Sequence, residues 1–140
     1  MPSMATRPYS ESLERLRAAG LRPTRQRLAL ARLLYGRGHR HVTAEQLHAE
    51  ALAATVRISL ATVYNSLHQF TEAGMLREVV VDPARRYFDT NVQPHHHFFM
   101  ATDGVLQDIP GKDVSIMGLP AVPAGTELQG IDVIVRIRRK

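Results

Sequence analysis

SLATVYNSLHQFTEAG, residues 59–74, is the stretch that decides the fold of this chain. Ser59 is a typical helix N-cap and Gly74 a typical residue just beyond a helix end, so the stretch predicts one helix of about four turns. Apolar side chains recur along it at helical spacing, at Leu60, Val63, Leu67 and Phe70. This spacing predicts that one face of the helix packs against a core.

The other face of this helix carries small, uncharged, hydrogen-bonding side chains: Ala61, Thr62, Tyr64, Asn65, His68 and Gln69. A surface helix of a globular protein normally carries charged pairs there instead. Amide and methyl groups suit the major groove of DNA, where they contact adenine edges and thymine methyl groups. An ordinary half-buried helix explains this segment alone equally well, so the flanking sequence has to decide.

The preceding segments predict a helix-turn-helix. Residues 20–27, GLRPTRQR, begin a helix that Thr24 caps after Pro23. Another helix is predicted from Thr43 to about Ala54, with inward residues Ala44, Leu47, Ala51 and Leu52. A short link, residues 56–58, then leads to the helix at Ser59, and helix, turn, helix is the organisation of many DNA-binding domains.

Three arginines lie at the start of the helix capped by Thr24, at Arg22, Arg25 and Arg27. The helix dipole disfavours cations at this end, and DNA phosphate would compensate for it. We therefore expect DNA contacts from both helix starts and from the polar face. The predicted DNA-binding residues are Arg22, Thr24, Arg25, Arg27, Ser59, Ala61, Thr62, Tyr64, Asn65 and Arg85.

After Gly74 the sequence predicts a β-hairpin, with strands over residues 76–81 and 86–89 and a turn over residues 82–85. A hairpin after a recognition helix is the wing of a winged helix, and Arg85 and Arg86 at its tip would reach the DNA backbone or minor groove. Further strands are predicted around residues 96–101, 105–109 and 131–137, with an irregular stretch reaching Gly125. Three short strands make a weak independent core, so we expect pairing with a second copy.

The predicted fold class is therefore α+β. A winged helix-turn-helix DNA-binding domain is predicted over residues 1–90, a hinge over Asn91–Pro94, and a small α/β dimerisation and sensing domain over residues 95–140. Counting Lys and Arg against Asp and Glu, residues 1–70 carry 10 against 4 and residues 71–140 carry 8 against 9. A basic first half beside a near-neutral second half favours nucleic-acid binding by the first.

Cysteine is absent from the 140 residues. Its absence fits a cytoplasmic protein and excludes disulfides, thiolate nucleophiles and a Cys-ligated structural zinc. No apolar run approaches the roughly 20 residues of a membrane span, and no signal-peptide pattern leads the chain. We therefore expect a cytoplasmic protein with no membrane partner.

Three consecutive histidines, His95, His96 and His97, stand directly before Phe98-Phe99. On an extended chain His95 and His97 face one way and His96 faces the other. Imidazole binds divalent metals and is a competent axial ligand of haem iron, for which the neighbouring aromatic rings would offer apolar surface. The triplet therefore predicts a metal or haem site, and the sequence leaves the choice between them open.

Five motifs occur in the order found in one known family: LRPTRQR at residues 21–27, HVTAE at 41–45, SLATVYN at 59–65, YFD at 87–89 and HHH at 95–97. Together they resemble the ferric uptake regulators, over nearly the whole chain after residue 10. HHHFF, residues 95–99, is most similar to the haem-responsive iron response regulator branch. The resemblance implies a homodimer with a winged helix and a C-terminal α/β domain. It also implies binding to palindromic operators of iron-metabolism genes as an iron- or haem-responsive transcription regulator.

The resemblance also implies metal ligands. The family's interdomain regulatory site matches at His41, Asp89, His97 and Asp108, while Phe99 replaces its other histidine. Iron, manganese or zinc at these four residues is expected. Haem is expected at His95, His96 and His97.

Other family sites are lost in this chain. Met100 and Asp103 stand where the first Cys pair of a structural zinc site would be. A second metal site keeps His96 at most, because Phe98 replaces its carboxylate. We therefore expect no structural zinc of the Cys-ligated kind.

Two other classes of function stay open: a haem- or metal-binding carrier, and a small metalloenzyme using the histidine triplet. The enzyme has less support, because the chain contains no nucleophile motif, Gly-rich phosphate loop or HExxH pattern. A regulator must bind duplex DNA with a strong salt dependence and a sequence preference, which a carrier or an enzyme lacks.

Overall fold

The structure, a computed structural model, describes residues 7–140, so residues 1–6 of the domain predicted over residues 1–90 lie outside the described part. The chain divides into two compact units, an N-terminal unit of residues 1–92 and a C-terminal unit of residues 93–140. The mixture of helices and sheets confirms the α+β prediction. Within the described residues, no helix is long and apolar enough to cross a lipid bilayer.

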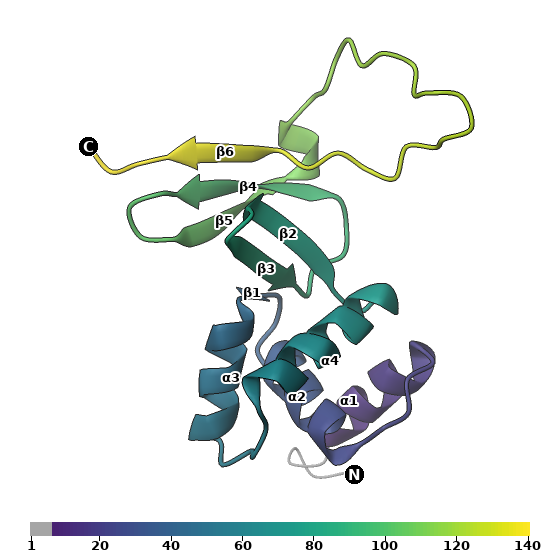
Figure 1. The fold of residues 1–140 in the computed structure, drawn as a ribbon, viewed down its shortest axis with the longest axis vertical. Helices are drawn as coiled ribbons and strands as arrows, with labels where there is room; N and C mark the ends of the chain where they lie inside the picture. Colours follow the sequence, from purple (N-terminus) through teal and green to yellow (C-terminus); the bar gives the residue numbers. More distant parts are fainter. Residues whose placement is uncertain (1–6) are drawn as a thin grey trace. The chain divides into compact units, whose positions relative to one another are not determined.

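In its described part, from residue 7 on, the N-terminal unit combines four helices with a small antiparallel sheet (Figure 1). Its elements are α1 (Arg7–Ala18), α2 (Arg25–Tyr35), β1 (His41–Val42), α3 (Ala44–Ala53), α4 (Leu60–Glu72), β2 (Arg77–Asp82) and β3 (Arg85–Asp89). The strand order is β1-β3-β2, with β2 and β3 forming the predicted hairpin. This is a winged helix-turn-helix, with α3 and α4 as the two helices of the motif.

The helix starts follow the capping residues that the sequence predicts. The Thr24 hydroxyl accepts a hydrogen bond from the Arg27 backbone N–H, and the Ser59 hydroxyl accepts one from Thr62. Thr43 forms a full capping box with Gln46. α4 ends before Gly74, whose φ of +81° is the left-handed conformation that favours glycine just after a helix.

The core of the N-terminal unit contains the predicted inward faces. Val63, Leu67 and Phe70 of α4 are fully buried, as is Leu47 of α3. Leu52, predicted to face inward, is 53% exposed, so that prediction is wrong. The inward residues of α3 recur at positions 44, 47 and 51, and residue 52 is rotated about 100° further around the helix.

Two elements of this unit were missed by the sequence patterns, α1 and β1. The Arg15 guanidinium of α1 lies 4.2 Å from the centre of the Tyr35 ring of α2. Tyr35 donates a hydrogen bond to the Met75 carbonyl at 2.6 Å, and burial raises the pKa of Tyr35 to about 12. β1 is two residues long and forms by pairing with β3, a long-range contact that a local pattern does not reveal.

The C-terminal unit is a three-stranded sheet with the order β5-β4-β6. Its elements are β4 (His95–Met100), β5 (Val105–Pro110), the 3-10 turn η1 (Gly111–Asp113) and β6 (Ile134–Ile137). β4 pairs antiparallel with β5 and parallel with β6. The central strand is therefore the one that carries the histidine triplet.

The last strand is shorter than predicted. Residues 131–133 join a long irregular stretch after η1, which leaves the sheet and returns to it at β6 (Figure 1). Val135, in the middle of this strand, is 36% exposed. β6 is an edge strand that pairs only with β4 in this sheet. The side chains of an edge strand are covered less than those of a central strand, so the alternation of residues 131–137 does not produce one buried face.

Candidate metal centre and nucleic-acid interface

The three histidines of β4 lie alternately on the two faces of its sheet. His95 is 4% exposed and His97 is 2% exposed, while His96 between them is half-buried. The predicted alternation is therefore confirmed. His96 Nδ1 accepts a hydrogen bond from the Val133 backbone N–H at 3.0 Å, which fixes its ring against the segment before β6.

Asp108 of β5 lies directly opposite His97 in the β4–β5 ladder. Its Oδ1 is 3.3 Å from His97 Nε2 and 3.8 Å from His95 Nε2. The two imidazole rings lie with their centres 4.6 Å apart. Two buried histidines and one carboxylate, itself 48% exposed, therefore converge within the C-terminal unit.

The hydrogen bond of His95 fixes which of its nitrogens is available to a metal. His95 Nδ1 lies 2.6 Å from the Gln93 carbonyl oxygen, which only accepts, so Nδ1 carries the proton. Nε2, the nitrogen on the Asp108 side, then carries the lone pair that a metal requires. A histidine oriented by a backbone carbonyl is the usual arrangement around bound metals.

The spacing of these donor atoms fits a first-row divalent ion. Ligand atoms that each lie about 2.1 Å from one ion are at most about 4.2 Å apart. The two Nε2–Oδ1 distances, 3.3 and 3.8 Å, fall below this limit. Two imidazoles and a carboxylate suit iron, manganese or zinc, and the donor set includes no sulfur.

Two of the four residues predicted to bind metal at the regulatory site belong to the N-terminal unit. His41 of β1 and Asp89 of β3 are directly opposite each other in that sheet. Asp89 is 1% exposed and accepts a hydrogen bond from the Asn91 backbone N–H at 2.9 Å. The His41 ring lies edge-on to the Tyr87 ring. The predicted ligands thus occur as two cross-strand pairs, His41 with Asp89 and His97 with Asp108.

The predicted DNA-contacting face of α4 is open in the N-terminal unit. Ala61 and Asn65 are exposed, and Thr62 and Tyr64 are half-buried. The Ser59 hydroxyl is within 2.9 Å of the Thr62 hydroxyl, so both side chains help to start the helix. Small and amide side chains therefore line the outer face of α4.

The predicted phosphate-binding arginines differ in their surroundings. Arg22 and Arg25 are exposed at the start of α2. Arg27 donates hydrogen bonds to the Arg22 carbonyl at 2.8 Å and to Gln69 Oε1 at 2.9 Å. Arg27 thus ties the start of α2 to α4, an intramolecular role that the sequence did not indicate.

The wing carries its charges in pairs. Arg85 Nε is 3.8 Å from Asp82, and Arg86 donates a hydrogen bond to Glu78 Oε1 at 3.1 Å. Both arginines remain about half exposed. The hairpin therefore presents two cations whose charge is partly offset by its own carboxylates.

Sequence reasoning missed Glu45 and Gln93 as site residues. Tyr64 of α4 donates a hydrogen bond to Glu45 Oε1 of α3 at 2.6 Å, across 19 residues of sequence. Gln93 acts on His95 through its backbone carbonyl, for which no side-chain motif exists. The Tyr64–Glu45 contact depends on how α3 and α4 pack, which no local pattern reveals, whereas the Gln93–His95 contact is local but is made by the backbone.

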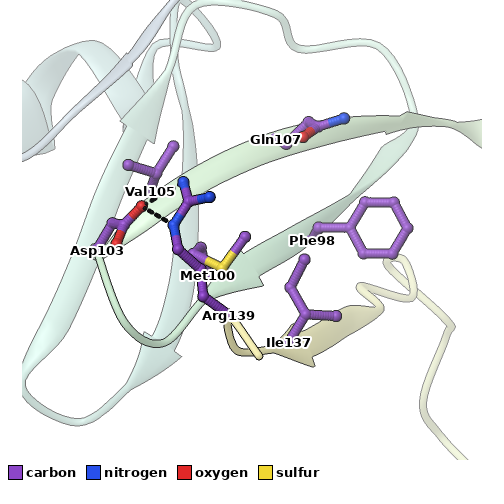
Figure 2. A pocket seen from close by; sticks show the side chains of 7 residues that line it. All are labelled: Phe98, Met100, Asp103, Val105, Gln107, Ile137 and Arg139. Atoms are coloured by element: carbon purple, nitrogen blue, oxygen red, sulfur yellow. Dashed lines mark hydrogen bonds and ion pairs between the residues drawn. The ribbon is translucent and has the colours of Figure 1, made fainter.

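The other face of the C-terminal sheet contains a small pocket of about 110 Å³. Figure 2 shows Phe98, Met100 and Ile137 beside the charged pair that Asp103 forms with Arg139. The Arg139 guanidinium donates to Asp103 Oδ2 at 2.7 and 3.0 Å. Phe98, Met100 and Ile137 make an apolar patch on this face, which is also the face of β4 that carries His96.

Comparisons with known proteins agree with this organisation. The peroxide-responsive repressor PerR of Staphylococcus aureus (strain Mu50 / ATCC 700699) is 35% identical over 98 residues, which span 70% of this chain and 66% of that relative, just under two thirds. The ferric uptake regulator of Pseudomonas aeruginosa with manganese matches with a TM-score of 0.68 and 24% identity, covering 92% of this chain and 98% of that one.

The ferric uptake regulator of Vibrio cholerae matches with a TM-score of 0.71 and 22% identity, over 90% of this chain and 98% of that one. At these identities the two structures establish the fold alone, a winged helix followed by a small C-terminal domain. Because the sequence relatives are peroxide-responsive repressors, membership of the iron response regulator branch stays a prediction. The profile of the ferric uptake regulator family matches residues 18–119, and this chain belongs to that family.

Proposed function

We propose that this protein is a metal-responsive transcription regulator that binds duplex DNA through α4. One observation carries the proposal: a winged helix with an uncharged recognition face occurs in the same chain as two buried histidines, His95 and His97, that converge on the half-exposed carboxylate of Asp108. A carrier or a small metalloenzyme explains the cluster but not the winged helix.

The proposed signal is a divalent ion. His95 and His97 supply imidazole nitrogens, and Asp108 supplies a carboxylate oxygen. We propose that His41 and Asp89 of the N-terminal unit bind the same ion. Residues 90–94 are a short connection between Asp89 and His95, which limits how far the two can separate. A carboxylate only 1% exposed, as in Asp89, loses much of its hydration, and a cation offsets that loss.

An ion held by ligands from both units would restrict the angle between them. In a dimer, that angle sets the spacing of the two recognition helices on DNA. The ion changes DNA affinity only as far as it binds the DNA-competent arrangement more tightly than the others. Manganese is a suitable first probe, because the structure of the ferric uptake regulator of Pseudomonas aeruginosa is described with manganese.

Haem at His95, His96 and His97 is the second proposed ligand. Since His95 and His97 point to Asp108, His96 on the opposite face is the better candidate for an axial ligand, through Nε2. Haem and a divalent ion would then use different faces of β4. A haem titration followed by the absorption spectrum, in wild type and His96→Ala, tests this: unchanged binding in the variant argues against His96.

A peroxide signal is an alternative to metal availability, because the sequence relatives are named peroxide-responsive repressors. This chain has no cysteine to oxidise, so we propose that such a response would act through a metal at the histidine cluster. Treating iron-loaded and manganese-loaded protein with peroxide separates the two signals. Loss of DNA binding with iron alone favours peroxide sensing.

We expect the protein to be a symmetric homodimer that binds palindromic operators of iron-metabolism genes. The apolar face of the C-terminal sheet, with Phe98, Met100 and Ile137, is the proposed contact surface. Two-fold symmetry would place two recognition helices on two half-sites. Sedimentation at micromolar concentration without DNA should give the mass of a dimer, and a monomer there would count strongly against this assembly.

Asn65 should contribute to base recognition. Its side chain is exposed on the outer face of α4, and an amide can pair with both adenine atoms N6 and N7. Asn65→Ala should weaken binding to the specific operator by about 1–3 kcal/mol and binding to random DNA much less. Fluorescence anisotropy with both duplexes measures this, and equal losses on the two would remove Asn65 from base readout.

Arg25→Ala is the matched contrast. Arg25 is exposed at the start of α2 and is expected to contact phosphate. The change should weaken specific and random binding almost equally and make the dependence of log K on log salt shallower by about one unit. A salt titration with and without manganese therefore tests DNA binding and metal response in one experiment.

A further inference from the structure

The carboxylate of Glu45 faces the recognition helix. Glu45 lies in the first turn of α3, where the helix dipole favours a negative charge. Its Oε1 is 2.6 Å from the Tyr64 hydroxyl. An ionised carboxylate only accepts hydrogen bonds, so the hydroxyl is the donor. The same hydrogen bond raises the pKa of Tyr64, which keeps the hydroxyl protonated.

Both ends of this contact are held by helix caps. Thr43 and Gln46 form the capping box around the start of α3, next to Glu45. Ser59 caps α4 five residues before Tyr64. Glu45 and Tyr64 therefore project from two helix starts of fixed geometry, within the helix-turn-helix itself.

The hydrogen bond determines what Tyr64 can offer to a base. A phenol has one proton, and here that proton is donated to Glu45, so only the oxygen lone pairs remain. In the major groove, adenine and cytosine present amino donors, whereas guanine N7 and O6 and thymine O4 are acceptors. Tyr64 together with Glu45 presents acceptors alone, which match an amino group and repel the oxygen and nitrogen acceptors.

Resting on the proposed DNA-binding function, we propose that Glu45 is a positioning residue that sets the base preference of Tyr64. By taking the hydroxyl proton, it restricts Tyr64 to bases that carry an exocyclic amino group, adenine or cytosine. Specificity at this position is then decided by α3, although the contact to DNA is made by α4.

The test is selection from a random duplex library by the full-length protein in the presence of manganese. Wild type should select adenine or cytosine at one position in each half-site, and Tyr64→Phe should lose that preference. Glu45→Gln has nearly the same shape, but its amide also donates, which frees the hydroxyl to donate in turn. Sites with guanine or thymine at that position should then gain about fivefold in relative affinity. This is the lower end of the discrimination that one base contact provides.

Two further variants make the outcome specific. Glu72→Gln removes an exposed carboxylate elsewhere on α4 and controls for the change in net charge, so it should strengthen binding to all sequences alike. In Tyr64→Phe/Glu45→Gln, the effect of Glu45→Gln on base preference should vanish, because no hydroxyl remains for Glu45 to act on.

If Glu45→Gln keeps the base preference of the wild type, this inference is overturned while the proposed DNA-binding function stands. A shift that persists in the double variant would also overturn it, since Glu45 would then contact the base directly. If wild type selects no sequence at all, the proposed DNA-binding function fails and the inference fails with it.

Discussion

His97→Ala should abolish the change in operator affinity that manganese produces in the wild-type protein. His97 is 2% exposed, and its Nε2 lies 3.3 Å from Asp108 Oδ1. Effectors typically change the affinity of a coupled site by about 5–150-fold, which is the range expected for wild type. Without the imidazole, manganese should give no change in DNA affinity.

The physical reason is the loss of one donor from a small set. Replacing residues that merely orient metal ligands costs about 10–100-fold in metal affinity, so loss of a ligand should cost at least about 100-fold. Metal binding and DNA binding are linked, so manganese cannot change the DNA affinity of a variant that no longer binds it. Isothermal titration with manganese and anisotropy with the operator measure the two quantities separately.

Asp108→Asn and His96→Ala complete this experiment. Asp108 is about half exposed, so replacing its carboxylate by an amide of the same shape should preserve the fold while removing the charge that a cation requires. His96, next to His97 but on the other face of β4, serves as the matched control and should keep the manganese response. A full manganese response in both Asp108→Asn and His97→Ala would refute the assignment of the metal site.

The features that could be predicted from the sequence are those with a local physical cause. Thr24, Thr43 and Ser59 marked helix starts, because a side-chain oxygen satisfies backbone N–H groups a few residues ahead. The alternation of His95, His96 and His97 followed from the two-residue period of a strand. These signals do not depend on what the element later packs against.

The features that could not be predicted arise where distant segments meet. Glu45 and Tyr64, or Arg27 and Gln69, become partners only after the helices pack. The contact of His95 with Asp108 depends on the β4–β5 register, which the sequence does not specify by itself. The shortened β6 has the same origin, since a strand requires a paired neighbour as well as an alternating pattern.

Leu47→Ala should lower the free energy of unfolding by about 2–5 kcal/mol, whereas Leu52→Ala should change it by no more than about 0.5 kcal/mol. Both leucines belong to α3, and the sequence predicts both to face inward. Leu47 is fully buried and Leu52 is 53% exposed. Truncating Leu47 removes buried apolar contacts and leaves a cavity, while Leu52 has little packing to lose.

The pair is a matched test, because the substitution and the helix are the same and helix propensity changes equally. Urea unfolding followed by circular dichroism gives both values, provided that the dependence on urea keeps the same slope. Dimerisation would couple unfolding to protein concentration, so both variants are measured at one concentration with wild type. Equal losses for the two leucines would mean that α3 is rotated about its axis relative to this structure, which would also separate Glu45 from Tyr64.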